Sequence, residues 1–418
     1  PKLFPKPNRI MRRGVVFAGR DLKIISDAIK KKKKFYVLSG IMPTNERIHF
    51  GNKMVVENVK YFQEHNAEAY VLVADLEAAA ARGVPLEEAK KRALDFHIPA
   101  FVALGLDTKK TTFYFQSENI KVCQIASEAS KKVTANEFKA IYGSLDPGRI
   151  YSAFTQVGDI LYPQLKERVP GIIPVGIDQD PHIRLTRDVA RRMKEKKFFL
   201  PSGIYHKYTP SLDGSIKMSK SKPESCIELP EDIESVKRKI KRALSGGRDT
   251  LEEHRKKGAV IEKDMVFELM KQHLVEDDNE LNKIYNSYKS GKMTSGELKE
   301  IACSKMEKFM NKFVKGVDEA DIIKTDGDYI YTIAQGNLVI AKAYPADEAK
   351  ILSTTKIDNF YPNELFIDKD RLLIFGSSSY SFETPKETTQ EQKQGEPVQG
   401  EQLVEKIRAP EYYPYYSN

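Results

Sequence analysis

The fold of this chain is decided by residues 35–63, FYVLSGIMPTNERIHFGNKMVVENVKYFQ. Phe35 to Leu38 is a short apolar run typical of a buried strand, and Ser39-Gly40 ends it. A helix is predicted from His49 to Gln63, because the apolar residues of this segment recur at helical spacing. A strand, a turn and a helix in this order form the repeating unit of a parallel α/β sheet.

The same unit recurs further along the chain. The helix predicted over 86–104 follows Pro85 and precedes Gly105, which are typical start and stop signals. Repeated alternation of strands and helices predicts a parallel sheet with helices on both faces, and ligands of such sheets bind at the carboxyl ends of the strands. The further strands are expected at 70–74, 112–115 and 172–175, and the further helices at 119–132 and 180–194.

The sequence after Pro230 is organised differently. Helices without intervening strands are predicted at 230–244, 265–274, 278–288 and 295–313. From about Val317 strands return, at 328–333, 337–341 and 371–375, and the first two read as a hairpin turning at residues 334–336. Beyond Ser377 the chain is rich in Glu, Gln, Thr, Gly and Pro, which predicts disorder.

Composition indicates a globular protein of more than one domain. The chain has 418 residues, which is too many for one ordinary core. Of these residues, 40% are hydrophobic and 30% are charged. No apolar run is long enough to span a membrane, and residues 1–13 are basic with no apolar core following, so we expect no signal peptide. The three cysteines are far apart in sequence, which fits a reducing cytoplasm. The net charge of +9 permits a polyanionic partner.

Two short motifs carry the chemistry. Lys217-Met218-Ser219-Lys220-Ser221 lies in a loop after Asp213-Gly214, and His49-Phe50-Gly51-Asn52 begins a helix. A helix N-terminus presents free N–H groups to phosphate, and nucleotidyl transfer needs cations and donors where charge develops. Together the motifs predict a clamp for the phosphates of ATP.

These motifs resemble the two signatures of the class I aminoacyl-tRNA synthetases, in the same order. Over residues 12–315 the chain is most similar to the tryptophanyl-tRNA synthetases of archaea and eukaryotes. The most specific pieces are GIDQDPHIRLTRD at 176–188 and SGGRDTLEEHR at 245–255. The segment after residue 317 resembles one blade of an archaeal β-propeller family.

The sequence patterns and the resemblance together predict a domain order. It consists of an N-terminal basic, helical lead-in (1–34), a Rossmann-like α/β catalytic domain (35–229), a helical anticodon-binding domain (230–316), a β-rich appendage (317–376) and a disordered tail (377–418). The resemblance also implies ATP as substrate, accompanied by Mg²⁺, and assigns no protein residue as a metal ligand.

The resemblance assigns roles residue by residue. Charge on the transferring and leaving groups would be stabilised by His49, Asn52, Lys217 and Lys220. ATP would contact these four together with Gly40, Pro43, Gly51, Gly176, Asp178, Met218, Ser219 and Ser221. The amino acid would contact Leu38, Glu77, Gln156, Asp159 and Gln179. Glu77 is equally explained as a carboxylate at a helix entry, and Gln156 as ordinary surface polarity.

The choice of amino acid depends on fewer residues. Asp159 could accept from an indole N–H or from a phenol O–H, so it does not decide between tryptophan and tyrosine. Leu38 offers no partner to a phenol and suits a wider ring, and Gly158 leaves room, so tryptophan is predicted. The chain departs from the family pattern at Asn52, where a second His is commoner, and at Leu38 and Leu72, where eukaryotic tryptophanyl enzymes have Tyr and Gln.

The sequence therefore predicts a cytoplasmic, homodimeric tryptophan–tRNA ligase with tRNA(Trp) and L-tryptophan as its partners. A tyrosine–tRNA ligase remains the alternative substrate assignment. A non-catalytic paralogue that binds RNA or protein is the alternative from another class, and the retained Asp178, Gln179, Lys217 and Lys220 argue against it.

Overall fold

The computed structural model describes residues 3–316, 323–325, 328–334, 336–344, 348–357, 360–368 and 371–378. The disordered tail predicted for residues 377–418 lies outside these ranges except for its first two residues. No helix in the described part is both long and apolar enough to cross a membrane.

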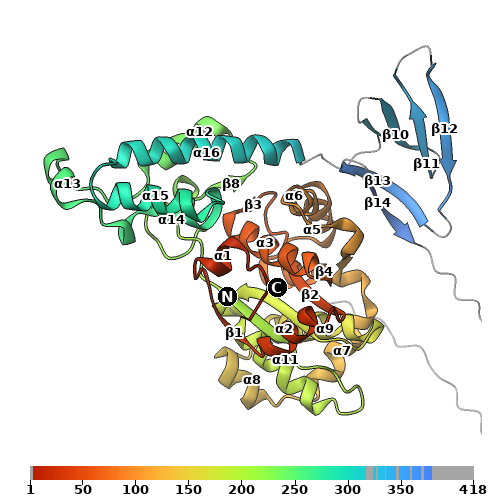
Figure 1. The fold of residues 1–418 in the computed structure, drawn as a ribbon. Helices are drawn as coiled ribbons and strands as arrows, with labels where there is room; N and C mark the ends of the chain where they lie inside the picture. The colour runs from red at the N-terminus through yellow and green to blue at the C-terminus, as the bar shows by residue number, and fades with distance from the viewer. Residues whose placement is uncertain are drawn as a thin grey trace, which may run out of the picture. The chain divides into compact units, whose positions relative to one another are not determined.

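A six-stranded sheet forms the centre of the first 230 residues (Figure 1). Its order is β1-β7-β6-β2-β4-β5, and every strand is parallel to its neighbours except β1, which pairs antiparallel with β7. The mostly parallel sheet confirms the α/β prediction. The strands are β1 (Val16–Arg20), β2 (Phe35–Ile41), β4 (Ala67–Val73), β5 (Thr111–Phe115), β6 (Gly171–Gly176) and β7 (Ser202–His206).

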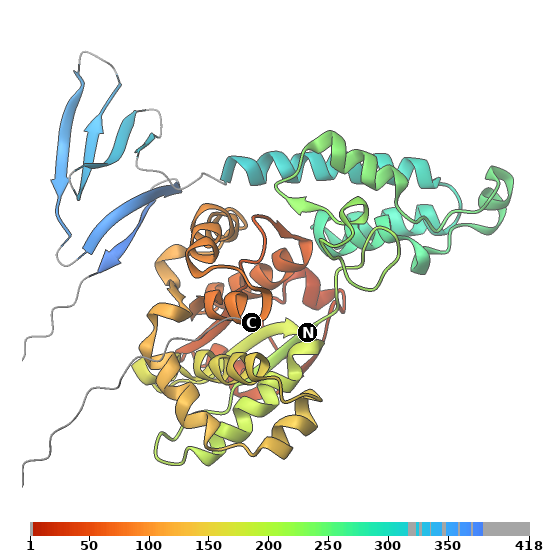
Figure 2. The same cartoon turned by 180° about the vertical axis from the view of Figure 1, so that it is seen from behind.

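Alternation along β2 explains the layers. Phe35 and Val37 belong to the apolar cluster that includes residues of α2 and α3, whereas Tyr36 and Leu38 belong to the cluster that includes residues of α9 and α11. Successive side chains of a strand point to opposite faces, so helices cover both faces of the sheet (Figures 1 and 2). These helices are α2 (Leu22–Lys30), α3 (Phe50–Glu64), α9 (Pro147–Leu161) and α11 (Asp180–Arg192).

The strand order places a switch point between β2 and β6. The chain proceeds from β2 to β4 and β5 on one side, and then crosses to β6 and β7 on the other. Ligands of doubly wound sheets bind where the order reverses, at the carboxyl ends of the strands. The ends of β2 and β6 are therefore where a site is expected.

The helical region after residue 230 confirms the helices predicted there. Its elements are α12 (Ile233–Arg242), α13 (Leu251–Lys257), α14 (Met265–Leu269), α15 (Asp278–Lys289) and α16 (Ser295–Gly316). The predicted helix over 265–274 continues beyond α14 as a π-helical turn, Met270–Leu274. The predicted helix over 86–104 is likewise divided into α5 (Leu86–Arg92), a π-helical turn (Ala93–His97) and α6 (Ile98–Ala103). Pro99 lies at the start of α6 and has no N–H with which to continue an α-helical ladder.

Several elements have no counterpart in the sequence analysis. β1 lies within the segment expected to be a helical lead-in, and β7 and α9 lie in segments for which no element was predicted. The remaining elements before residue 230 are α1 (Arg9–Arg12), β3 (Ile48–His49), α4 (Asp75–Arg82), α7 (Ile120–Ser130), α8 (Ala135–Tyr142), α10 (Pro163–Lys166) and β8 (Glu228–Leu229).

The C-terminal strands form antiparallel sheets. β10 pairs with β11 with Ala334 opposite Asn337, which confirms the predicted hairpin. A four-stranded sheet has the order β12-β11-β10-β9, and β13 pairs with β14. The bounds are β9 (Ile323–Thr325), β10 (Tyr329–Ala334), β11 (Asn337–Lys342), β12 (Lys350–Thr355), β13 (Phe360–Asp368) and β14 (Arg371–Ser378).

Candidate active site

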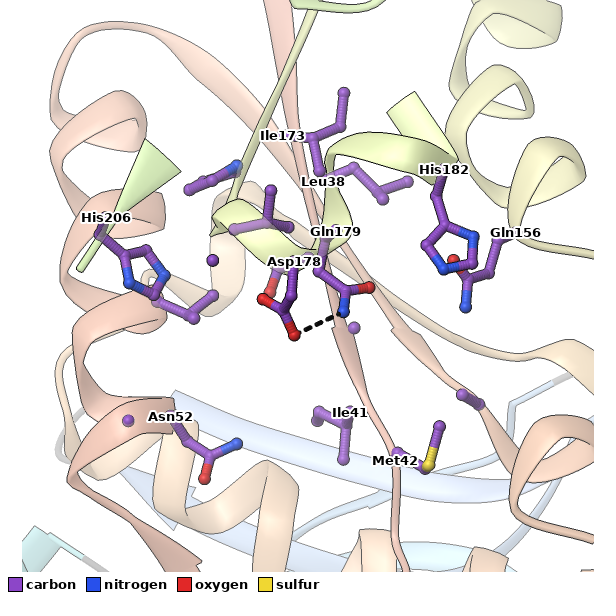
Figure 3. Close-up of a pocket in the computed structure, with 18 of the residues that line it drawn as sticks. Leu38, Ile41, Met42, Asn52, Gln156, Ile173, Asp178, Gln179, His182 and His206 are labelled. Carbon is purple, nitrogen blue, oxygen red and sulfur yellow. Dashed lines mark hydrogen bonds between the residues drawn. The ribbon is translucent and has the colours of Figure 1, made fainter. Parts of the chain in front are cut away.

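A cavity of about 390 Å³ opens at the carboxyl ends of β2, β4 and β6, where the switch point predicts it (Figure 3). It brings together most of the residues predicted from sequence. Those that line it are Leu38, Gly40, His49, Gly51, Asn52, Glu77, Gln156, Gly176, Asp178, Gln179, Lys217 and Met218.

His49 and Asn52 are fixed by the start of α3. The Nδ1 atom of His49 accepts from the N–H of Gly51 at 3.0 Å, and the Oδ1 atom of Asn52 accepts from the N–H of His49 at 3.1 Å. Burial, together with the charges of two nearby lysines, lowers the pKa of His49 to about 4, so the ring is neutral at neutral pH. Because Nδ1 is the acceptor, the proton is on Nε2, which makes that atom a donor. Asn52 keeps its amide nitrogen as a second donor.

Gly51 is required by this capping arrangement. A Cβ atom at residue 51 would lie 2.7 Å from Cε1 of the His49 ring. Asn52, where a second histidine is commoner, closes the capping box with its side-chain oxygen.

Asp178 and Gln179 lie on the turn that follows β6. The Nε2 atom of Gln179 donates to Oδ2 of Asp178 at 3.1 Å (Figure 3), and Nζ of Lys217 lies 3.7 Å from the same oxygen. A Cβ atom at Gly176 would lie 2.5 Å from Oδ1 of Asp178, so glycine is needed for the carboxylate to fold back over the strand end. The carboxylate thus has lysine as its ionic partner within the cavity.

Four predicted ATP contacts do not line the cavity. Nζ of Lys220 donates to the backbone oxygen of Arg47, and Oγ of Ser219 lies 2.9 Å from Oγ of Ser221. Pro43 is buried in the segment between β2 and α3. Lys220 therefore ties its loop to the segment before the first motif, and the side chain would have to leave Arg47 to reach a phosphate.

The other end of the cavity is apolar with a polar rim. Its walls are the side chains of Leu38, Leu72, Ile160, Ile173 and Ile183. At its rim Oε2 of Glu77 accepts from Nε2 of Gln156 at 2.8 Å. Neither residue is merely on the surface, because both line the cavity and they are bonded to each other.

Two sequence expectations about the amino-acid pocket need correction. Asp159 is 1% exposed and lies behind the cavity wall, where Tyr114 OH (2.9 Å) and Gln116 Nε2 (2.6 Å) occupy its two oxygens. Gly158 makes no room for a ligand: a Cβ atom there would lie 2.4 Å from the backbone oxygen of Val122, so the glycine allows α7 and α9 to approach each other.

The cavity also contains polar side chains that the sequence analysis did not select. His182 lies beside Gln156 in Figure 3, and its Nδ1 is 3.0 Å from Tyr142 OH. Burial lowers the pKa of His182 to about 4, so it is neutral at neutral pH. It belongs to the quoted motif at 176–188, which could have drawn attention to it. His206, Tyr208 and Thr209 follow or end β7, a strand that was not predicted.

Comparison with known families confirms the resemblance. The family described as tRNA synthetases class I (W and Y) matches residues 30–311, and a beta propeller domain family matches residues 310–409. The tryptophan–tRNA ligase of Methanocaldococcus jannaschii is 44% identical over 75% of this chain and 86% of its own length. The tryptophan–tRNA ligase of Aeropyrum pernix is 41% identical over 76% of this chain and 86% of its own length.

Solved structures agree with the fold. The crystal structure of tryptophanyl-tRNA synthetase from Aeropyrum pernix superposes with a TM-score of 0.72 at 42% identity, covering 75% of this chain and 86% of that one. The crystal structure of a tryptophanyl-tRNA synthetase from Encephalitozoon cuniculi bound to tryptophan superposes with a TM-score of 0.68 at 28% identity, covering 75% of this chain and 87% of that one.

The chain thus belongs to the class I tRNA synthetases for tryptophan and tyrosine. Members of this class are enzymes that use ATP. Its similar relatives within the class are tryptophan–tRNA ligases.

Proposed function

We propose that this chain, a tryptophan–tRNA ligase, activates tryptophan with ATP in the cavity at the carboxyl ends of β2 and β6. The observation that carries the proposal is that one cavity combines phosphate-binding groups with an apolar pocket. His49, Asn52 and Lys217 line one part of it, and leucine and isoleucine side chains with a carboxylate at their rim line the other. Nucleotide and amino acid would meet between them.

In the first step the carboxylate of tryptophan attacks the α-phosphate of ATP in line, and pyrophosphate leaves. The neutral ring of His49, donating from Nε2, and the amide of Asn52 stabilise charge on the transferring group. Lys217 and Lys220 stabilise the leaving pyrophosphate, and Asp178 accepts from the ribose hydroxyls. Positioning and electrostatics supply the rate in such transfers, with no covalent enzyme intermediate.

The side chain and ammonium of tryptophan occupy the opposite end. Leu38 and Leu72 cover the faces of the ring, and neither offers a partner that a phenol would need. Glu77, Gln156 and Gln179 hold the ammonium and carboxylate. Glu77 of α4 and Gln156 of α9 would thus bind substrate as well as each other.

Mg²⁺ would accompany ATP. This ion takes its ligands largely from substrate phosphates and water, with one or two carboxylates. Asp178 and Glu77 are carboxylates lining the cavity. In the described part of the chain no group of three or more His, Cys, Asp or Glu could hold a metal by itself, so we propose that the ion arrives on the nucleotide.

The second step of the reaction involves tRNA and the helical domain after residue 230. In the second step the terminal ribose of tRNA(Trp) attacks the adenylate, and the helical domain 230–316 reads the anticodon. Basic residues at the ends of α12 and α13 support contact with a polyanion.

A cytoplasmic homodimer would let one tRNA span two subunits. Three large apolar side chains, Ile120, Leu145 and Tyr151, are exposed in the region that follows the edge strand β5, which supports association there. Sedimentation velocity of the wild type and of Ile120→Asp would test it, with the equally exposed Leu251→Asp of α13 as the control. A monomeric wild type would contradict the proposal.

Exchange of labelled pyrophosphate into ATP tests the activation step. We expect exchange that requires tryptophan and that falls when Asp178→Asn or His49→Ala is introduced. Exchange that proceeds without tryptophan, or that survives both substitutions unchanged, would rule out this cavity as the site.

A further inference from the structure

Three buried carboxylates lie near the rim of the amino-acid pocket. Asp75, Glu77 and Asp159 are 0%, 3% and 1% exposed, and none forms an ion pair with a lysine or arginine of the described part of the chain. Only Glu77 lines the cavity. Burying carboxyl groups without an ionic partner is costly, so they need hydrogen-bond donors around them.

Gln116 is the donor shared by two of these carboxylates. It follows β5, is 0% exposed, and its Nε2 donates to Oε1 of Glu77 at 3.1 Å and to Oδ2 of Asp159 at 2.6 Å. One N–H is directed at each carboxylate. The remaining donors to Glu77 are Ser152 Oγ at 2.7 Å and Gln156 Nε2 at 2.8 Å.

The bridge fixes the orientation of the amide. Turning it over would place the amide oxygen against an oxygen of Glu77, so the nitrogen faces the two carboxyl groups. Its Oε1 has no hydrogen-bond partner among the described residues although it is buried. Leaving an acceptor unpartnered costs about 1–3 kcal/mol.

We propose that Gln116 is a positioning residue for tryptophan: it holds Glu77 directed at the substrate ammonium by bridging Glu77 to Asp159. The inference rests on the proposed function of the cavity, and it replaces direct contact of Asp159 with the indole. Tyr114 holds Asp159, Asp159 holds Gln116, Gln116 holds Glu77, and Glu77 binds the ammonium. Gln116 itself touches no substrate.

The charge state of Asp159 supports this arrangement. Burial, assisted by the charges of Glu77 and Asp75, raises the pKa of Asp159 to about 8, while the hydrogen bonds from Gln116 and Tyr114 oppose the rise. Asp159 is therefore largely protonated at neutral pH, so Gln116 bridges a neutral carboxyl group to Glu77, and no lysine or arginine of the described residues pairs with Glu77.

The test separates substrate affinity from folding. Gln116→Met keeps the length of the side chain and removes both donors. We expect its KM for tryptophan and its Kd for tryptophan, measured by calorimetry, to rise about tenfold or more, equivalent to about 1.4 kcal/mol, with the KM for ATP unchanged. Gln116→Asn, which keeps an amide too short to span both carboxylates, should show the same selective loss.

Gln164→Met is the matched control. Gln164 is also buried, and its Nε2 donates to the backbone oxygen of Phe199 at 3.0 Å, away from the cavity. It should lower the melting temperature comparably and leave both KM values alone. If Gln116→Met and Gln116→Asn also change only the melting temperature, or raise both KM values equally, the positioning role is wrong; if one variant fails to fold, the other decides.

Glu77→Gln distinguishes this failure from failure of the proposed function. If Glu77→Gln weakens tryptophan binding and the Gln116 variants do not, only the bridge is wrong. If Glu77→Gln has no effect either, the ammonium does not bind at Glu77 and the pocket assignment itself falls.

Discussion

His49 shows how one side chain serves the fold and the chemistry together. Its Nδ1 caps α3 through the N–H of Gly51, and this bond places the proton on Nε2. The lowered pKa, about 4, keeps the ring neutral across physiological pH. A neutral donor can stabilise developing negative charge without surrendering a proton to it.

Lys220 provides a sharp prediction at the residue scale. Its Nζ is bound to the backbone oxygen of Arg47, next to the first motif, and the proposed function requires it to move from there to a phosphate. Lys220→Ala should lower the rate of tryptophan-dependent pyrophosphate exchange by about 100-fold or more while the Kd for tryptophan stays nearly the same.

Lys222→Ala is the control for that substitution. Its Nζ is 2.9 Å from Asp213 in the same loop, so its removal changes the local charge equally without removing a phosphate contact. An exchange rate lowered alike by both substitutions would show that the loop is merely disturbed and that no phosphate contact is lost.

The sequence could locate residues whose roles are local. His49, Asn52, Asp178 and Gln179 lie at helix starts or strand ends within a few residues of the signal that identifies them. Gln116 could not be found in this way, because its role depends on Glu77 and Asp159, which are 39 and 43 residues away. Asp159 was placed in the pocket by similarity alone, and only the packed structure shows Tyr114 and Gln116 bound to it.

At the scale of elements, α9 positions the pocket by packing closely on α7. Gly158 makes this approach possible, since a side chain there would collide with the backbone of Val122. Gly158→Ala should therefore destabilise the protein by about 1–3 kcal/mol, measured by urea unfolding, because neither backbone can yield easily.

Gly148→Ala on the same helix is the matched control. A Cβ atom there would meet Asp146 Oδ1 at 3.3 Å and no backbone atom closer than 3.6 Å. It should be neutral or slightly stabilising, as replacing a helical glycine usually is. Equal losses at both positions would mean that helix packing at Gly158 is not the cause.

Elements with a clear apolar pattern in their own sequence were predicted. Strands that form because neighbouring strands pair with them were not. β2, β4 and β6 each contain a run of apolar residues, as expected of strands buried on both faces. β7 is short, contains Gly203, and is a strand because β1 and β6 pair with it. β1 pairs with that strand alone, so it depends on a distant partner: Val16, its first residue, lies opposite His206, 190 residues further along the chain.

At the scale of the whole molecule, buried histidines make stability depend on pH below neutrality. Burial lowers the pKa of His49, His97 and His182 to about 4 from 6.5. Between these values the unfolded chain binds more protons than the folded one, so this stability is present above pH 6.5 and is lost as pH falls toward 4. Each histidine contributes at most about 3 kcal/mol.

His97→Gln tests this dependence away from the active site. Its Nε2 is 2.6 Å from the backbone oxygen of Asn45, a bond that glutamine can replace. The melting temperature of the variant should fall less steeply than that of the wild type between pH 6.5 and 4.5. The pKa of Asp159 is raised, so the stability that this group contributes is lost as pH rises toward 8. Asp159 is present in both the wild type and the variant, so its contribution cancels when their curves are compared. Parallel curves would contradict the assignment.

The most direct test of the central claim is a competition for charging. The full chain is incubated with tRNA, ATP and equimolar tryptophan and tyrosine, and the aminoacyl-tRNA formed is identified by mass spectrometry. Leu38 and Leu72 wall the pocket and offer no partner to a phenol, which predicts tryptophanyl-tRNA as the product. Tyrosyl-tRNA, or no charged tRNA of either kind, would contradict it.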